Sequence, residues 1–466
     1  MCCLSTLAVP GRTCYPGGMR IDVEQRVWAP GRRVLTAGLV LTITLAAFEA
    51  LAVVTILPLI AEDLQGLRLY GWVTSAFFLG TLVGVVVAGQ EADRRGPAPP
   101  FAAGLAVFAA GLALGGAAPT MGLLVAARAL QGLGAGALTA VSYVAVRRAY
   151  PEAVRPRVFA IWSTAWVMPG LVGPAVSAEV AQRLGWRIVF LGLLVGVAVS
   201  ALLTLPALRK LGRGTGAAAR MATVRDALRV AAGTGLVLAG LLRPQPVVAA
   251  ILLLAGGALG FGPLRRLLPA GTLRARGHVP AAIASRGLLT FVFFGADSYI
   301  PLTLTSVRGQ SVRVAGLVLT ASTLSWTAGA WVQERLAARW SPRHAITLGM
   351  CLLSASIVVV ASGLLATTPL AVPIAGWTTA AFGIGLAYAP TSLVVLARAP
   401  DGQEGSLSAA LQLSDNLGVA IGAGLGGAAV AYGEAAAWPA SAGLAIAFGS
   451  CLLGGALGIA VTARLP

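Results

Sequence analysis

The sequence predicts an all-α integral membrane protein, and three observations lead to that prediction. Of the 466 residues, 57% are hydrophobic and only 11% are charged, and the mean hydropathy is +0.85. The apolar residues are gathered into runs of roughly 20 or more, the length a helix needs to cross the hydrocarbon core of a membrane. The basic residues lie in the short segments between these runs. A soluble domain could not cover its surface with so few polar side chains.

About fourteen apolar runs mark the expected membrane-spanning helices. The first six are 34–60, 70–90, 100–118, 121–146, 157–181 and 187–207. Two shorter runs, 227–242 and 247–263, form either a hairpin or a partly interfacial pair. The last six are 281–304, 314–336, 345–365, 372–397, 407–432 and 440–463. This order predicts a six-helix bundle over 34–208, a basic linker with two extra helices over 209–280 and a second six-helix bundle over 281–466.

The distribution of arginine predicts the orientation of the chain. Most arginines fall on alternate loops, at 32–33, 94–95, 147–157, 209–229, 265–276, 335–343 and 398. By the positive-inside rule these loops, and with them both termini, are expected on the cytoplasmic side of a bacterial inner membrane. The net charge of +18 is then expected to meet anionic lipid headgroups rather than nucleic acid.

The residues before the first apolar run are expected to form a cytoplasmic segment, 1–33. Met19 begins a natural cytoplasmic start, Met19-Arg20-Ile21-Asp22, so the true start is expected there. The first run is too long for a secretory signal and has no small-residue cleavage site after it. The five cysteines show neither the spacing of a metal site nor that of a disulfide framework.

Four ionisable side chains stand well inside expected helices: Glu49, Arg128, Asp297 and Asp415. An ionisable group at membrane depth costs about 2.5–3.5 kcal/mol, so each requires a reason. Counting residues at about 1.5 Å each places the first three roughly 10–14 Å from the outer ends of their helices. They are therefore expected at similar depths.

These residues suggest a proton relay, in which a carboxylate takes up a proton from one side and releases it to the other. A structural ion pair between Glu49 and Arg128 is the alternative. Asp415 lies nearer the cytoplasmic end, where a local hydrogen bond with Asn416 would also account for it.

Aromatic side chains inside the runs are candidates for a substrate cavity. Tyr299 and Trp326 have polar neighbours in the sequence, and Trp166 and Asn416 are included as further cavity candidates. Packing within the bundle, or contact with lipid, is the alternative for each aromatic residue.

Catalytic constellations are missing from the sequence. The two histidines lie in predicted cytoplasmic loops, and the only lysine, Lys210, is followed by Leu211, so the chain has no phosphate-binding Gly-Lys-Ser/Thr sequence. We therefore expect neither an enzyme nor an ATP-driven pump, and no metal or other cofactor; a proton gradient is the expected energy source.

Two motifs then resemble those of the major facilitator superfamily, and in particular its fourteen-span drug:proton antiporters. The loop after the second run, 89–96, is similar to the superfamily's Gly-x-x-x-Asp-Arg-x-Gly loop, with Gly89, Asp93, Arg94 and Gly96 at the matching positions. The resemblance implies that Asp93 faces a helix N-terminus across the bundle interface and latches the cytoplasmic side. In the fourth run, the segment 128–136 resembles the family's Arg-x-x-Gln-Gly-x-Gly motif, which implies a part for Arg128 in proton coupling.

Two further motifs match less completely. Gly173 and Pro174 resemble the Gly-Pro of the antiporter motif in the fifth span, but Pro169 replaces its first glycine. In the first run, Glu49 stands nine residues before Pro58, where the family pattern has an aspartate. The four motifs cover about 45–190, and the C-terminal half matches in pattern only.

The resemblance implies a proton-coupled antiporter that exports amphipathic small molecules by alternating access of two bundles, functioning as a monomer. An exporter of an endogenous lipid, metabolite or siderophore, an importer, and a non-transporting sensor or enzyme on the same scaffold are the alternatives.

Overall fold

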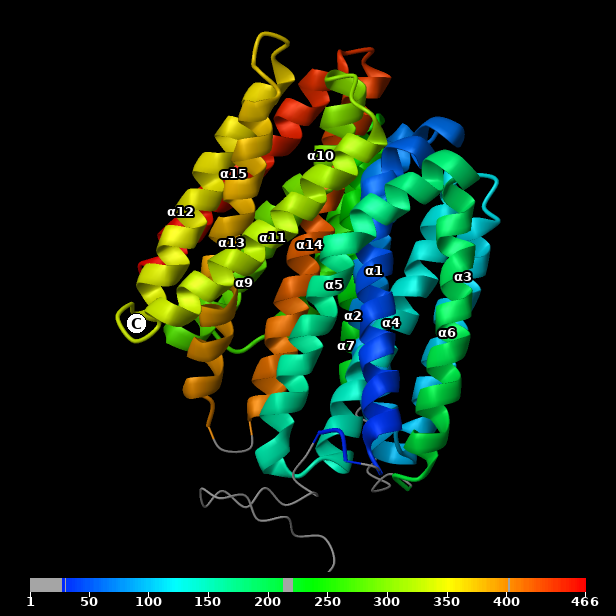
Figure 1. Ribbon diagram of the computed structural model, residues 1–466. Coiled ribbons are helices and arrows are strands. Elements are labelled where there is room, and N and C mark those ends of the chain that lie inside the picture. The colour runs from blue at the N-terminus through cyan, green and yellow to red at the C-terminus, as the bar shows by residue number, and fades with distance from the viewer. Residues whose placement is uncertain (1–26, 30, 213–220, 401–402) are drawn as a thin grey trace, which may run out of the picture.

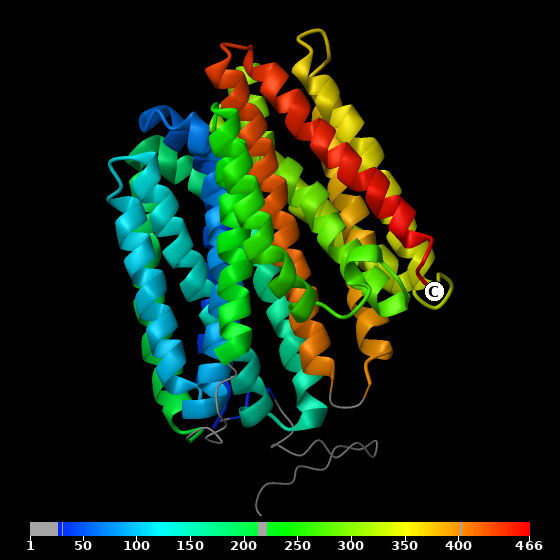
Figure 2. The same ribbon diagram turned by 180° about the vertical axis from the view of Figure 1, so that it is seen from behind.

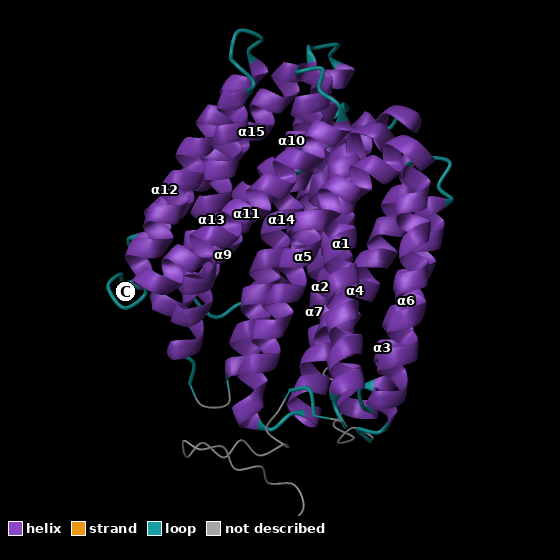
Figure 3. Ribbon diagram, viewed as in Figure 1, coloured by secondary structure: helices purple, strands orange, loops and turns teal. Residues whose placement is uncertain are grey.

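The computed structural model describes residues 27–29, 31–212, 221–400 and 403–466, and within these ranges every regular element is a helix (Figure 3). The expectation of an all-helical protein is confirmed. Eleven of the described helices are long and apolar enough to cross a membrane, which confirms a multi-pass membrane protein.

The described residues form fourteen long helices: twelve fall into two groups that pack mainly within themselves, and the other two form a hairpin between the groups in the sequence (Figure 1). The N-terminal bundle comprises α1 (Arg33–Asp63), α2 (Tyr70–Arg95), α3 (Ala98–Gly116), α4 (Met121–Ala149), α5 (Arg155–Leu184) and α6 (Trp186–Arg209). The hairpin comprises α7 (Met221–Leu241) and α8 (Pro246–Leu267). The C-terminal bundle comprises α9 (His278–Asp297), α11 (Val312–Leu336), α12 (Pro342–Ala361), α13 (Ala371–Ala397), α14 (Glu404–Ala435) and α15 (Ala440–Thr462).

Short elements connect some of these helices. They are η2 (Leu67–Leu69), η3 (Glu152–Val154), η4 (Thr272–Arg274), η6 (Ser362–Leu364), α10 (Ile300–Leu302) and the π-helical turn η5 (Thr303–Val307). The last two continue the direction of α9 after a break at Ser298–Tyr299, so that the segment His278–Val307 forms one candidate span. Within α5, the side chains of residues 156, 159, 160, 163, 164 and 166 lie outside the description.

The two ends of the molecule differ in charge, and we call them the arginine-rich end and the arginine-poor end. The arginine-rich end contains the first residues of α1 and α5 and the last residues of α2, α4, α6 and α13, with Arg33, Arg95, Arg148, Arg155 and Arg209. The arginine-poor end contains the opposite ends of the same helices. Because successive helices alternate in direction, the basic loops of the sequence gather at one end.

Glycine allows the helices of each bundle to approach closely. A Cβ atom added at Gly132 of α4 would lie 1.9 Å from the carbonyl oxygen of Phe77 in α2. The α2 and α4 backbones are thus almost in contact, which brings functional side chains from both helices together. The same small-residue packing joins the hairpin, where Gly233 of α7 faces Gly256 of α8.

The two bundles meet in the half of the molecule nearer the arginine-poor end. Gly71 of α2 faces Gly427 of α14, and the Ser75 hydroxyl donates to the Ala420 carbonyl at 2.7 Å. On the other side of the molecule, Gly316 of α11 packs against the backbone of Pro174 in α5. The bundles are therefore joined by the helix pairs α2–α14 and α5–α11.

The α7–α8 hairpin lies against one of these pairs. Figure 2 shows it in green beside the orange α14. Leu238 of α7 packs on Gly424 of α14, and Arg68 of η2 donates to the Leu242 carbonyl at 3.1 Å. At the other end of the hairpin, Arg266 binds Asp226 through two hydrogen bonds of 2.8 Å. The hairpin thus contacts helices of both bundles.

Candidate functional site

An ion pair lies in the middle of the N-terminal bundle. Arg128 of α4 binds one carboxylate oxygen of Glu49 in α1, and both side chains are buried (0% exposed for Glu49 and 2% for Arg128). Arg128 also donates through Nε to the Val73 carbonyl of α2 at 3.2 Å and through a terminal nitrogen to Gln131 at 2.6 Å. The residues Glu49 and Arg128, both singled out from the sequence, are therefore brought together.

The surroundings of this pair leave one acceptor free. The second oxygen of Glu49, Oε2, is buried and has no hydrogen-bond partner among the described residues. The arginine is held more completely, because its guanidinium also lies 4.3 Å from the centre of the Phe77 ring. An acceptor buried without a donor is costly when it is charged, and it is the natural position for a proton.

The depth expected for Glu49 was wrong. Helix α1 does not end near Pro58 but continues to Asp63, so Glu49 lies fourteen residues before its end, near the centre of the helix. Proline removes only one backbone donor, and in a buried apolar helix the freed carbonyl does not have to end the helix. Arg128 still reaches Glu49, because α1 extends past the first turn of α4.

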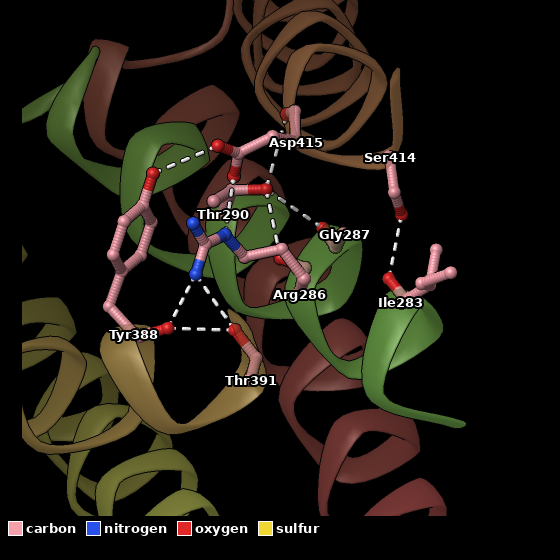
Figure 4. Close-up of polar contacts among 8 residues, drawn as sticks. All are labelled: Ile283, Arg286, Gly287, Thr290, Tyr388, Thr391, Ser414 and Asp415. Carbon is pink, nitrogen blue, oxygen red and sulfur yellow. Dashed lines mark hydrogen bonds and ion pairs between the residues drawn. The ribbon is translucent and has the colours of Figure 1, made fainter. Parts of the chain in front are cut away.

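A second polar cluster lies in the C-terminal bundle, between α9, α13 and α14 (Figure 4). Arg286 donates through Nε to Asp415 at 3.1 Å and through a terminal nitrogen to the Thr391 hydroxyl at 2.7 Å. The Tyr388 hydroxyl donates to the other Asp415 oxygen at 2.9 Å. The Arg286 guanidinium lies 3.2 Å from the centre of the Tyr388 ring, and the Thr290 hydroxyl donates to the backbone carbonyl of Asp415 at 3.2 Å.

Sequence reasoning missed Arg286 and therefore misjudged the surroundings of Asp415. The Asp415 carboxylate pairs with Arg286 of another helix and not with its neighbour Asn416. The sequence did carry a signal for Arg286, because a charged residue five positions inside the expected apolar run 281–304 requires a reason just as the other buried charges do. Asp415 is the more accessible partner, with 18% of its side chain exposed against 6% for Arg286.

Aromatic rings adjoin this cluster. The ring centres of Trp326 and Tyr388 are 5.3 Å apart, and those of Trp326 and Phe293 are 5.2 Å apart. Trp377 stacks on Phe293, with the ring centres 4.9 Å apart. Trp326, a cavity candidate from the sequence, thus contacts Tyr388, which in turn binds Asp415. An apolar aromatic surface therefore lies beside a charged pair.

Asp297 and Tyr299 lie elsewhere, at the contact between the bundles. Asp297 is the last residue of α9, 7% exposed, and no hydrogen bond or ion pair reaches its carboxylate from the described residues. Tyr299 is completely buried, donates to the Ala423 carbonyl and packs its ring on Tyr70 of α2 at 5.6 Å. In this conformation Tyr299 closes the contact between the bundles and does not line an open cavity.

Four candidates remain, namely Asn416, Trp166, Gly173 and Pro174. Asn416 follows Asp415 on α14 and is buried, whereas the side chain of Trp166 lies outside the described part of the chain. Gly173 of α5 faces the ring of Phe48 in α1. Pro174 lies against α11, so the Gly-Pro segment is located where the bundles meet.

The loop expected to act as a latch follows the end of α2. Gly96 has a φ of 91° and ψ of 171°, a backbone conformation open essentially to glycine alone. Arg148 of α4 donates to the Ala92 carbonyl at 3.4 Å, which ties this end of α2 to α4. Arg95 pairs with Glu91 at 2.6 Å, and Gly89 lies near Ala140 of α4. The helix that Asp93 would latch stays a prediction.

The described residues contain no group of histidine, cysteine, aspartate and glutamate side chains that could hold a metal ion. The carboxylates of the two clusters, Glu49 and Asp415, are groups that can take up and release protons. The Asp415 carboxylate also lies beside aromatic rings.

Comparison with known proteins agrees with this architecture. The family model described as Major Facilitator Superfamily matches residues 39–423. A Mycobacterium tuberculosis protein described as a "probable multidrug-efflux transporter" is 26% identical over 437 residues, which cover 90% of this chain and 91% of that protein. Multidrug resistance protein 3 of Bacillus subtilis is 28% identical over 158 residues, 34% of this chain and 31% of that protein.

Solved structures show the same fold at low identity. A POT family transporter in complex with 5-aminolevulinic acid superposes with a TM-score of 0.68 at 15% identity, covering 94% of this chain and 96% of that one. A D-xylose-proton symporter superposes with a TM-score of 0.67 at 13% identity, covering 93% of this chain and 98% of that one.

Proposed function

Because the chain belongs to the major facilitator superfamily and is therefore a transporter and not an enzyme, we propose that it is a proton-coupled antiporter. It exports amphipathic small molecules across a bacterial inner membrane by alternating access of its two bundles. The similarity to a protein described as a probable multidrug-efflux transporter supports the direction and the substrate class. A proton gradient is its energy source, and it works without a cofactor and as a monomer.

The Glu49–Arg128 pair is the observation that carries the proposal. A buried carboxylate with one oxygen bound by arginine and the other unpartnered can exist with or without a proton. Protonation removes the charge of Glu49 and leaves the buried Arg128 without a counter-charge, so uptake of a proton changes which packing of α1 and α4 is more stable. A change of this kind is what couples a proton to a conformational change.

The orientation follows from the arginines. We place the arginine-rich end and both termini in the cytoplasm, with fourteen membrane crossings, so that the basic loops meet anionic lipids and not nucleic acid. With this orientation, the contacts between the bundles that Tyr70 makes with Tyr299 and Gly71 makes with Gly427 lie on the outer side. The conformation described here is thus closed toward the outside, and the Asp93 loop latches the cytoplasmic side in the opposite conformation.

The C-terminal cluster supplies the substrate side of the exchange. Asp415 is partly exposed and lies beside Tyr388, which contacts Trp326. An amphipathic molecule would place a polar group near Asp415 and an apolar ring on Trp326. Asp297, buried without a partner where the bundles meet, is a second proton site that is exposed when that contact opens.

Replacing Glu49 by glutamine tests the proposal. Glutamine keeps the shape and an acceptor for Arg128, which also keeps its hydrogen bonds to Val73 and Gln131, so the variant is expected to fold, but it cannot exchange a proton. In proteoliposomes, Glu49→Gln is expected to lose substrate uptake driven by a pH gradient while keeping exchange of substrate against substrate. Glu62→Gln, at an exposed position on the same helix, is the matched control and is expected to behave as wild type. Undiminished pH-driven uptake in Glu49→Gln would remove Glu49 from the mechanism.

A further inference from the structure

A cavity of about 230 Å³ lies at the arginine-poor end, away from both polar clusters. Its apolar wall contains Leu67 of η2, Leu302 of α10 and Val430 of α14. Glu434 and Trp438, from the end of α14 and the turn that follows, provide its polar and aromatic parts. The volume lies below the roughly 300–1,000 Å³ of sites for drug-sized ligands, so only a small molecule fits.

The charge of this cavity comes from a carboxylate that is not paired with arginine, unlike Asp63 and Glu179 at the same end. Asp63 is paired with Arg187 at 2.9 Å, and Glu179 is paired with Arg313 at 2.7 Å. No hydrogen bond or ion pair from the described residues reaches the Glu434 carboxylate. The cavity therefore presents an uncompensated negative charge, carried by an exposed carboxylate that no arginine of the described residues neutralises.

Trp438 lines the same cavity as this carboxylate and is held in place by its neighbours. Its ring makes an edge contact with Tyr432 at 5.3 Å, and its backbone N–H donates to the Gly433 carbonyl at 2.8 Å. The preceding residue, Ala437, has a φ of 55°, a left-handed conformation that is unfavourable for alanine. This turn lies between Glu434 and Trp438, the two residues that give the cavity its charge and its aromatic ring.

We propose that this cavity binds a small organic cation of the alkylammonium class. One carboxylate beside an indole ring attracts such a cation by charge and by the cation–π interaction, and the apolar wall receives its alkyl groups. A single carboxylate provides too few oxygen ligands for a calcium or magnesium ion. Both a free quaternary ammonium compound and the choline headgroup of a lipid carry this chemistry.

The position of the cavity gives the bound cation an effect on conformation. Leu67 belongs to the N-terminal bundle, whereas Leu302, Val430, Glu434 and Trp438 belong to the C-terminal bundle. The cavity is complete only while the bundles are in contact at this end. A ligand that binds one conformation stabilises it by mass action, so the cation favours the conformation that is closed at the arginine-poor end.

Equilibrium dialysis of radiolabelled tetraethylammonium against the purified full chain in a maltoside detergent tests the proposal. We expect saturable binding that weakens at least tenfold in Glu434→Gln and in Trp438→Ala, and less in Trp438→Phe, which keeps an aromatic ring. Glu62→Gln is the matched control, because Glu62 is an exposed carboxylate at the same end that does not line the cavity. A thermal unfolding midpoint equal to that of wild type shows that each variant is folded.

The outcomes separate this proposal from proton-coupled transport. Binding is measured without a gradient, so Glu49→Gln is expected to bind as wild type does. Binding that is unchanged in Glu434→Gln, or no saturable binding in wild type, would overturn the proposal. Repeating the titration in nanodiscs identifies the source: weaker Glu434-dependent binding in phosphatidylcholine than in phosphatidylglycerol assigns the site to a lipid headgroup, and equal binding assigns it to a free cation.

Discussion

Among the described residues, each bundle holds one deeply buried arginine, and the two arginines are neutralised in different ways. Arg128 faces Glu49, which has no other hydrogen-bond partner among the described residues. Arg286 faces Asp415, whose second oxygen also accepts a hydrogen bond from Tyr388. Glu49 is thus the less satisfied of the two carboxylates. At the scale of single residues this difference separates a proton site from a partly accessible polar site.

Removing Arg128 is expected to be more damaging than neutralising Glu49. Arg128→Met leaves the Glu49 carboxylate buried without a counter-charge, which costs about 3–5 kcal/mol of stability. The double variant Glu49→Gln/Arg128→Met removes that charge and is expected to recover part of the loss. The thermal unfolding midpoint in detergent measures both. A double variant as unstable as Arg128→Met alone would show that the pair is not what holds α1 and α4 together.

Tyr388 is expected to act through its hydroxyl and its ring separately. Tyr388→Phe removes the hydrogen bond to Asp415 but keeps the ring between Arg286 and Trp326, at a cost of about 1.5–3 kcal/mol, the usual value for a bond to a charged group. Tyr388→Leu also loses the ring contacts and should lower the unfolding midpoint further. Equal midpoints for wild type and Tyr388→Phe would argue against a stabilising role for the hydroxyl.

The sequence revealed which residues were unusual but not how they would pair. Glu49, Arg128 and Asp415 could be found because charge is costly inside an apolar run. The partner of Asp415 could not be found by inspecting its neighbours, since Arg286 is 129 positions away along the chain. Trp326 and Tyr299 looked alike in the sequence, yet one adjoins the polar cluster and the other closes the contact between the bundles.

At the scale of the helices, the glycines of α4 set the distance to α2. Gly132 faces the Phe77 carbonyl directly, whereas a Cβ atom at Gly122 of the same helix would meet nothing within 4 Å. The close approach matters for the ion pair, because Arg128 reaches the Val73 carbonyl across the same α2–α4 contact.

Substituting these two glycines is expected to give opposite results. Gly132→Ala forces α2 and α4 apart and should cost about 1–3 kcal/mol, as other overpacked sites do. Gly122→Ala meets no obstacle and favours the helix, so it should be neutral or slightly stabilising. Thermal unfolding of both variants side by side is the measurement. A Gly132→Ala protein as stable as Gly122→Ala would contradict the close packing.

The helices could be predicted well from apolar runs, but their ends and interruptions could not. Helix α1 passes through Pro58, and α5 passes through Pro169 and Pro174. Pro169 has no N–H, so it cannot donate the usual helical hydrogen bond to the Ala165 carbonyl. That carbonyl instead accepts a hydrogen bond from Thr44 of α1 at 3.4 Å. A neighbouring helix thus compensates for the proline, and this compensation cannot be read from the local sequence.

At the scale of the whole molecule, alternating access requires the α5–α11 contact to open. A Cβ atom at Gly170 of α5 would lie 3.2 Å from the Cβ atom of Thr323 in α11. Gly455 of α15 and Ser354 of α12 have nearly the same geometry, at 3.1 Å, but both belong to the C-terminal bundle. Both separations are near the roughly 3.5–4.5 Å that a disulfide requires.

A disulfide between the bundles is expected to stop transport. In a background without the five native cysteines, oxidised Gly170→Cys/Thr323→Cys should be inactive and should recover on reduction. Oxidised Gly455→Cys/Ser354→Cys should retain activity near that of the cysteine-free parent, because its cross-link lies within one bundle. Uptake of a fluorescent lipophilic cation into proteoliposomes measures both. Full activity in the oxidised α5–α11 pair would contradict a rocking motion of the bundles.

The order of helices predicted two bundles and a linker, but not where the linker lies. Only the structure shows α7 against both α2 and α14. The packing of α7 depends on small contacts such as Leu238 on Gly424. Pairings of this kind are set by three-dimensional fit, and the hydropathy of the runs carries no information about them.

Proton movement caused by substrate tests the central claim most directly. Wild-type protein is reconstituted into liposomes that contain a pH-sensitive dye and have an acidic lumen, and a lipophilic cation is added outside. Antiport predicts that the luminal pH rises as the cation enters, at a rate well above that of protein-free liposomes and of Glu49→Gln. Protein-dependent entry of the cation with no change in luminal pH would contradict proton-coupled antiport.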